Sequence, residues 1–247
     1  MALEIRNVKK SFGDLKVLDG VSFEVEKGEF ACIVGESGCG KTTLLKIVAG
    51  LVKADEGEVL YDGRELKTED IAFVFQDDRL LPWRTALENV MFSLEMRMRE
   101  LDKKRREEIA KSFLELVGLK GFENYYPHQL SGGMRQRVGI CRALAVNPKV
   151  LLMDEPFASL DAQTRNRMQL ELLRIWERER KTILFVTHSV DEAVFLADKV
   201  VVLSPRPTKV LKVLEINLER PRDRTSPEFI GYRREIINFL QGSSFLI

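Results

Sequence analysis

A glycine-rich segment near the N-terminus constrains this chain more than any other feature. The run GESGCGKTT, Gly35–Thr43, fits the phosphate-binding loop pattern G-x-x-x-x-G-K-[ST]. An apolar run, Phe30–Val34, precedes it, and a helical pattern, Leu44–Val48, follows it. Strand, glycine loop and helix is the context that the motif requires, because glycines let the backbone fold around a phosphate without Cβ clashes. The segment therefore predicts a phosphate site between a strand and a helix.

Each residue type in the loop has a function in this interpretation. The backbone N–H groups of the loop and the positive end of the helix would face the anion. The Lys41 ammonium can reach the terminal phosphates, and the Thr42 hydroxyl can ligate Mg²⁺. A glycine-rich turn without a ligand is the alternative, and the presence of both side chains argues against it. The expected contacts come from Gly35, Ser37, Gly38, Cys39, Gly40, Lys41, Thr42 and Thr43.

A second apolar run ends in two acids. Val150–Met153 is typical of a buried parallel strand, and Asp154 and Glu155 follow it. Ligands bind at the carboxyl edge of open α/β sheets, so Asp154 could hold Mg²⁺ there, directly or through water. Glu155 would point to a different place and could polarise a water that attacks a γ-phosphate. Ordinary surface acids at the end of a strand are the alternative, and this motif alone does not exclude them.

The third signal is the string LSGGMRQR, Leu130–Arg137. Ser-Gly-Gly at the start of a helix offers a second set of backbone N–H donors to an anion, and a capped helix start with a flexible turn is the alternative. The full string resembles the signature motif of the ATP-binding cassette ATPases, the nucleotide-hydrolysing subunits of membrane transporters. The resemblance extends from about Leu3 to Leu203.

The resemblance implies further site residues. Phe12 resembles the aromatic that stacks on adenine, where Tyr is commoner, and Gln76 resembles the glutamine that senses Mg²⁺ and the attacking water. The run Ala158–Asp161 resembles the loop that crosses between protomers, with Ser159 in place of the usual Ala. His188 resembles the switch histidine that contacts the γ-phosphate. The implied catalytic residues are Glu155, His188 and Lys41; the metal ligands are Thr42, Gln76 and Asp154; and the nucleotide contacts outside the loop are Phe12, Gln76, Ser131, Gly132, Gly133, Asp161 and His188.

The fold implied by the resemblance is an α/β P-loop NTPase core with a mostly parallel sheet, an N-terminal antiparallel β subdomain and an inserted α-helical subdomain. Strand signals give way to helical periodicity after Pro82, which supports the insertion. We expect one domain over 1–247. Its core comprises 1–81 and 148–204, its helical subdomain 82–147, and its C-terminal tail, an edge hairpin and an amphipathic helix, 205–247.

The implied activity is hydrolysis of ATP with Mg²⁺. Two cassettes pack head to tail in the family, so that nucleotide lies between the loop of one and Ser131–Gly133 of the other. The implied partners are a second ATPase subunit, most simply another copy of this chain, integral-membrane permease subunits and, indirectly, a solute-binding protein. The segment after Gln76 would meet the permease; whether Leu80, Leu81 and Trp83 form an exposed patch or fill a core stays open.

Two short runs narrow the resemblance. Leu81–Trp83 and Ser204–Pro207 look like the importer subfamily for nitrate, taurine and alkanesulfonates. The implied function is therefore the energy-coupling subunit of a membrane importer for a small solute of this kind. The alternative is a soluble cassette ATPase in a non-transport process, which often carries two cassettes or long insertions.

Composition and charge set the remaining limits. The chain is 45% hydrophobic and 31% charged, which suits a globular protein, and its net charge of +1 argues against a nucleic-acid partner. No apolar run approaches the ~18 residues of a membrane span. Met1–Arg6 carries charge where a signal peptide would be apolar, and 3 cysteines without a CxxC motif suit a reducing compartment. We expect a peripheral protein at the cytoplasmic face of the cell membrane.

Cys39 carries one further expectation. A helix N-terminus lowers the pKa of a nearby thiol, so the Cys39 thiol should be more acidic than a free cysteine. Alkylation of this thiol should then block hydrolysis, and MgATP should protect against it.

Overall fold

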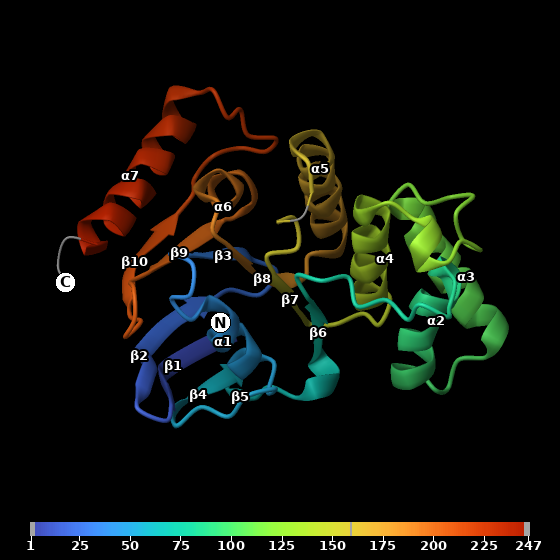
Figure 1. Ribbon diagram of the computed structural model, residues 1–247, viewed down its shortest axis with the longest axis horizontal. Coiled ribbons are helices and arrows are strands. Elements are labelled where there is room, and N and C mark those ends of the chain that lie inside the picture. Colours follow the sequence, from blue (N-terminus) through green and yellow to red (C-terminus); the bar gives the residue numbers. More distant parts are fainter. Residues whose placement is uncertain (1–2, 159, 245–247) are drawn as a thin grey trace. The chain divides into compact units, whose positions relative to one another are not determined.

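The computed structural model describes residues 3–158 and 160–244. Ser159, in the loop predicted to cross between protomers, lies outside the described residues. The chain divides into two compact units, whose elements can be followed in Figure 1. The first unit comprises 1–68 and 176–247, and the second comprises 69–175.

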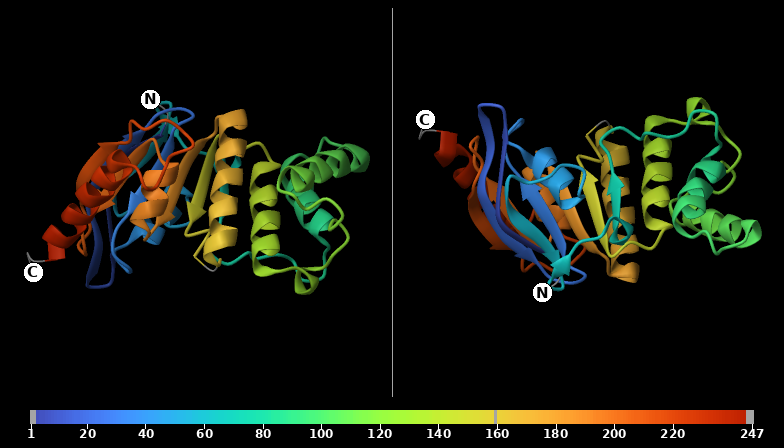
Figure 2. Two further views of the ribbon diagram at one scale, coloured as in Figure 1. Left: turned by 90° about the horizontal axis from the view of Figure 1, so that it is seen from above. Right: turned by 90° about the horizontal axis from the view of Figure 1, so that it is seen from below.

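An antiparallel sheet forms one part of the first unit. Its order is β2-β1-β4-β5, and its long strands β1 and β2 form a twisted ribbon (Figure 2). Leu3 and Ile5 are buried two positions apart in β1, as in a strand with one covered face, and a register shift between Ile5 and Val8 lets Val8 be buried as well. This sheet confirms the expected N-terminal antiparallel part. The strands are β1 (Leu3–Phe12), β2 (Leu15–Val25), β4 (Glu56–Tyr61) and β5 (Arg64–Glu65).

A second set of strands in the first unit runs in the order β10-β9-β3-β8. β3 pairs in parallel with β8 and with β9, while β10 pairs antiparallel with β9 at the edge. Every residue of β3 and β8 is buried, as expected for parallel strands that are covered on both faces. The strands are β3 (Phe30–Val34), β8 (Thr182–Thr187), β9 (Lys199–Leu203) and β10 (Val210–Glu215).

Three helices cover these strands. α1 contacts β8, α6 contacts β3, and α7 contacts both β9 and α6. The edge strand β10 and the helix α7 lie in the predicted tail, 205–247, but β10 forms its hairpin with β9, which we expected in the core. The helices are α1 (Lys41–Val48), α6 (Val190–Leu196) and α7 (Pro227–Ser244).

Arg222 fastens the tail to α6. The side chain is 5% exposed, and its guanidinium donates to Val194 O and Ala197 O, both at 2.6 Å. It also donates to Ile216 O at 3.0 Å and to Leu218 O at 3.2 Å. Burial lowers the pKa of Arg222 to about 10. One cation thus satisfies carbonyls at the end of α6 and in the segment after β10, groups that a helix end or loop would otherwise leave without a donor.

The second unit contains a parallel strand pair and helices. β6 (Ile71–Val74) pairs with β7 (Val150–Asp154). α2, α3 and α4 contact one another in a cluster (Figure 2) and fall within the predicted helical insertion, 82–147, whose boundaries stay a prediction. The last turn of α5 belongs to the first unit. Two 3₁₀ turns span Thr68–Asp70 and Pro127–Gln129. The helices are α2 (Ala86–Arg97), α3 (Lys103–Leu116), α4 (Gly132–Leu144) and α5 (Ala162–Glu179).

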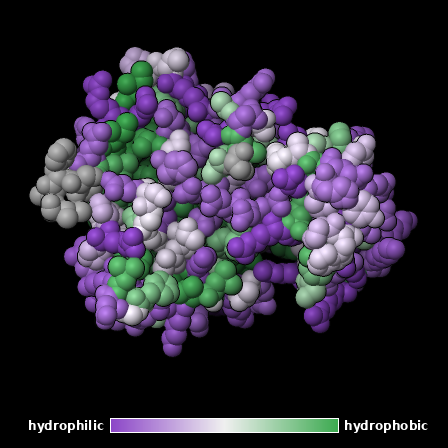
Figure 3. Space-filling view, in the orientation of Figure 1, coloured by the Kyte–Doolittle hydropathy of each residue, from purple (hydrophilic) through white to green (hydrophobic). Residues whose placement is uncertain are grey.

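The helix starts in the second unit follow local capping rules. Asp102 accepts from Arg105 N at 2.7 Å at the start of α3. Thr85 and Glu88 form a capping box at the start of α2, a sequence signal that we did not use to delimit this helix. α3 presents a charged, hydrophilic face (Figure 3), with a Glu107–Lys111 ion pair at 2.6 Å.

Candidate active site

The phosphate-binding loop closes around Lys41. Its side chain is 4% exposed, and Nζ donates to Gly35 O and to Glu36 O, both at 2.9 Å. Both acceptors are backbone carbonyls of the loop itself. An ammonium carries three N–H groups, so a third can face an anion inside the loop. The loop therefore holds a buried positive charge at the first residue of α1.

The glycines of the loop are required by its geometry. Gly38 has φ +76° and Gly40 has φ +111°, in the left-handed region that favours glycine. A Cβ on Gly35 would lie 2.8 Å from Cys39 Sγ, and a Cβ on Gly40 would lie 2.9 Å from Val17 Cγ1. The tip, 36–38, is exposed. The loop thus packs tightly at its base and opens to solvent at its tip.

Cys39 corrects one of the sequence-based expectations. The side chain is 3% exposed, and burial raises the pKa of its thiol, although the nearby Lys41 charge acts in the opposite direction. The expected lowering of this pKa is therefore wrong. Desolvation outweighs the lysine and the helix end, and the sequence pattern alone did not reveal that the Cys39 side chain points into the packed base of the loop.

We expect Cys39 to react with iodoacetamide at pH 7.5 at least about tenfold more slowly than a free thiol, because only the thiolate attacks and burial disfavours it. The rate should rise with pH through the alkaline range. Mass spectrometry of peptides after timed quenching measures each thiol separately. Cys32 and Cys141 are also buried with raised pKa values, so the urea-unfolded protein, in which all three should react quickly, is the control. Fast modification of native Cys39 at neutral pH would contradict this expectation.

His188 lies at the same sheet edge as the loop. β3 and β8 are parallel with Val34 opposite Thr187, and the next residue of each strand is Gly35 and His188, respectively. The imidazole is exposed. The turn is fixed because Ser189 N donates to Thr187 Oγ1 at 3.0 Å. The first unit thus brings together two of the predicted elements, although the contact of His188 with a γ-phosphate stays a prediction.

Phe12 is the last residue of β1, at the tip of the hairpin in the same unit. Its ring is 51% exposed, and Lys10 Nζ lies 5.3 Å from the ring centroid. An exposed aromatic face can stack on a planar group such as a base. Stacking of Phe12 on adenine stays a prediction.

In the second unit, Gln76, Asp154 and Glu155 gather at one sheet edge. β6 and β7 are parallel with Val74 opposite Met153, so Gln76 and the two acids follow at the carboxyl ends of neighbouring strands. Asp154 is 6% exposed. Glu155 has φ +44°, a left-handed conformation that costs a non-glycine residue about 1 kcal/mol or more. Strain at such a position often accompanies a functional site, where it sets the direction of a side chain.

The signature segment and Asp161 also lie together. Ser131 caps α4 by accepting from Met134 N at 3.3 Å. A Cβ on Gly133 would lie 2.9 Å from Thr164 Cγ2, in the first turn of α5. Thr164 N donates to Asp161 Oδ1 at 3.0 Å, which lowers the pKa of the Asp161 carboxyl. Gly133 therefore allows two helix starts with exposed polar ends to approach closely.

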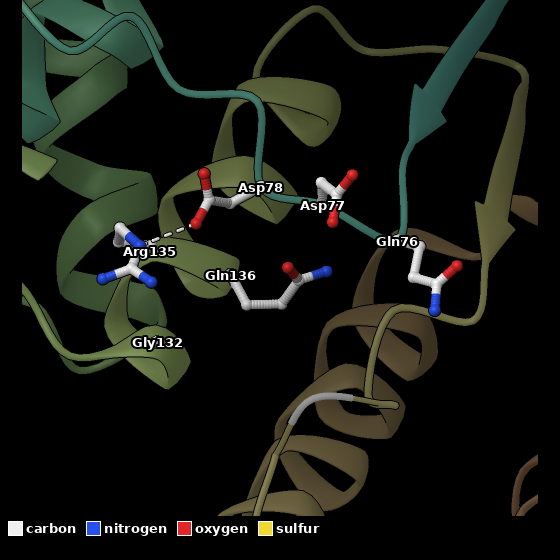
Figure 4. A pocket seen from close by; sticks show the side chains of 6 residues that line it. All are labelled: Gln76, Asp77, Asp78, Gly132, Arg135 and Gln136. Carbon is white, nitrogen blue, oxygen red and sulfur yellow. Dashed lines mark hydrogen bonds and ion pairs between the residues drawn. The ribbon is translucent and has the colours of Figure 1, made fainter.

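A pocket of about 460 Å³ connects the start of α4 with the segment after β6 (Figure 4). Arg135 Nε and Asp78 Oδ2 form an ion pair at 2.7 Å, and Arg135 Nη1 donates to Leu130 O at 2.9 Å. The sequence analysis did not predict the Asp78–Arg135 ion pair, because the two residues lie 57 positions apart and no local pattern links them. The lining residues are Gln76, Asp77, Asp78, Gly132, Arg135 and Gln136.

Asn89 holds the segment predicted to meet a permease. It is fully buried; its Oδ1 accepts from Leu81 N at 2.8 Å, and its Nδ2 donates to Leu81 O, Arg84 O and Thr85 O at 3.0–3.2 Å. Leu80 is 9% exposed and packs inside the unit, whereas Trp83 is 70% exposed. Of the three apolar residues, Leu80 therefore belongs to the core, Leu81 is half-buried, and Trp83 lies on the surface.

Comparison with known proteins identifies the family. The family model described as ABC transporter matches residues 18–158. The chain belongs to the ABC transporter family. Relatives include an uncharacterised ABC transporter ATP-binding protein of Methanocaldococcus jannaschii, 55% identical over 97% of this chain and 91% of the relative. The aliphatic sulfonates import ATP-binding protein of Bacillus anthracis is 44% identical over 96% of this chain and 95% of its own. The nitrate import ATP-binding protein of Synechocystis is 44% identical over 98% of this chain and 96% of its own.

Solved structures agree with this assignment. A dimeric ATP-binding cassette in a post-hydrolysis state, bound to ADP and Pi, has 34% sequence identity and a TM-score of 0.77, and the match covers 88% of this chain and 100% of that one. The expected ABC ATPase fold and enzyme class are confirmed. In residues 3–158 and 160–244, no helix has the length and apolarity needed to cross a bilayer.

Proposed function

We propose that this ABC transporter protein is the ATP-hydrolysing subunit of a membrane importer for a small solute of the nitrate, sulfonate or taurine kind. The main structural support for ATP binding is the phosphate-binding loop, which closes around the buried Lys41 ammonium. The relatives named as import ATP-binding proteins support the importer class and the solute class. They do not favour a soluble ATPase outside transport, because each of them is named for import.

The proposed reaction is attack of water on the γ-phosphate of ATP, which gives ADP and Pi. The loop binds the phosphates of the substrate, and Phe12 stacks on its base. Glu155 takes a proton from the attacking water, and His188 contacts the γ-phosphate. Ser131–Gly133 and Asp161 of a second copy complete the site, because one chain carries two half-sites.

Mg²⁺ fits the residues present. The Thr42 hydroxyl, the Gln76 amide and the Asp154 carboxylate are hard oxygen donors of the kind that Mg²⁺ prefers. Gln76 and Asp154 already share one sheet edge in the second unit. When bound, Mg²⁺ neutralises negative charge on the β- and γ-phosphates.

The proposed partners follow from the same assignment. A second copy of the chain forms the ATPase pair, and integral-membrane permease subunits meet the segment that Asn89 holds. A solute-binding protein takes part indirectly, and we propose no nucleic-acid partner. The protein would thus be peripheral, at the cytoplasmic face of the cell membrane.

We expect the specific ATPase activity of the purified chain to rise with protein concentration, because only a pair provides complete sites. Phosphate release with MgATP is measured over a hundredfold range of protein concentration, alongside equilibrium binding of MgATP. Binding should be present even where turnover is low. A specific activity that does not change with concentration, with no dimer detectable in ATP, would contradict the paired site, and absence of MgATP binding would contradict the proposed function.

A further inference from the structure

A turn after β9 is fastened to the phosphate-binding loop. The Thr208 hydroxyl donates to Cys39 O, inside the loop, and Thr208 is fully buried. Its backbone is also fixed, because Thr208 N donates to Val17 O and Asp19 N donates to Thr208 O, both at 2.9 Å. The turn, 204–208, is therefore attached to both the phosphate-binding loop and β2.

The same turn is closed across its base. Ser204 N donates to Lys209 O, and Lys209 N donates to Ser204 Oγ, both at 2.9 Å. Arg206 occupies the part of the turn between these contacts and is exposed. Hydrogen bonds at both ends of the turn fix the backbone around Arg206. The Cα position from which its side chain extends is therefore well defined.

Arg206 lies beside the exposed tip of the loop. A Cβ built on Gly38 would lie 3.7 Å from Arg206 Nη2, which is ordinary van der Waals contact. Among residues 3–158 and 160–244, no hydrogen bond or ion pair of this guanidinium is observed. A cation with five N–H donors therefore stands next to an anion-binding loop and is not neutralised by a carboxylate.

We propose that Arg206 is a nucleotide-binding residue that contacts the phosphates of ATP held by the loop. This inference rests on the proposed function, since it needs a nucleotide in the loop. Guanidinium groups form charge-assisted hydrogen bonds with phosphate oxygens and add long-range attraction for the anion. Arg206 acts on phosphate charge rather than on the base, so its contribution is the same for ATP and GTP.

The test compares equilibrium affinities for MgATP and MgGTP in the full chain. We expect Arg206→Ala to weaken the affinity for MgATP and MgGTP equally, by about five- to tenfold, as for the loss of one partly exposed charge-assisted contact. Arg206→Lys should retain part of the affinity, because it keeps the charge but not the forked donor geometry. The loss should shrink at high salt. Arg234→Ala, an exposed arginine on α7, is the matched control and should bind as the wild type does.

The outcomes separate this inference from the proposed function. Wild-type affinity in Arg206→Ala, with binding intact in the wild type, would overturn the inference alone. Weaker dimer formation with unchanged affinity of the single chain would overturn it as well, because Arg206 would then belong to the seam between copies. A loss for ATP but not for GTP would assign Arg206 to the base. No nucleotide binding by the wild type would overturn both proposals.

Discussion

Replacing Glu155 by Gln should stop ATP turnover while leaving MgATP binding intact. Glutamine matches glutamate in shape but cannot accept a proton, and removal of a general base lowers turnover by about 10²–10⁴-fold. The left-handed backbone at this position, φ +44°, is equally open to both residues, so the loop should keep its geometry. Because the bound ATP is then not consumed, the variant should accumulate as an ATP-bound dimer.

Phosphate release, MgATP titration and size-exclusion chromatography with ATP measure the three parts of this expectation. Glu177→Gln is the matched control, since Glu177 is an exposed acid on α5 with no predicted function in the site. It should turn over ATP and elute as the wild type does. Wild-type turnover by Glu155→Gln would show that another group is the base.

Replacing Arg222 by Ala should lower the free energy of unfolding by about 2–4 kcal/mol. The guanidinium donates to four backbone carbonyls, and its loss leaves buried acceptors without their donor, which costs about 1–3 kcal/mol for each group that water cannot reach. A cavity of arginine size adds to this cost. Urea unfolding followed by tryptophan fluorescence measures the change, because Trp176 is buried in the same unit.

Two variants control the Arg222 result. Arg222→Lys keeps the charge but cannot reach all four carbonyls, so it should be destabilised nearly as much as Arg222→Ala. Arg234→Ala removes an exposed arginine and should change the free energy of unfolding by less than about 0.5 kcal/mol. If Arg222→Ala were as stable as Arg234→Ala, the tail would be held by other contacts.

Local chemistry explains the parts of the fold that the sequence could predict. The phosphate-binding loop needs glycines at fixed offsets, and Asp102 and Ser131 cap helices through bonds to residues three positions on. The continuous apolar runs of β3 and β7 are fully buried strands. Each of these features depends on neighbours within a few residues, so a single sequence contains the necessary information.

The features that the sequence could not predict depend on distant partners. Asp78 pairs with Arg135, and Arg222 binds carbonyls of α6; neither spacing carries a local signal. The pKa of Cys39 was predicted with the wrong sign because burial, a tertiary property, outweighs the helix end. Asn89 did have a signal, a polar residue amid the apolar positions of α2, but its four bonds follow only from the folded loop.

The bonds of Asn89 have a mechanical consequence. One buried amide ties the backbone at Leu81, Arg84 and Thr85 to the first turn of α2, so the chain is held against the helix on both sides of Trp83. A force applied to the Trp83 indole is transmitted to the helix axis instead of being absorbed by a compliant loop. Substitution of Asn89 would remove these bonds and leave the exposed surface of Trp83 in place.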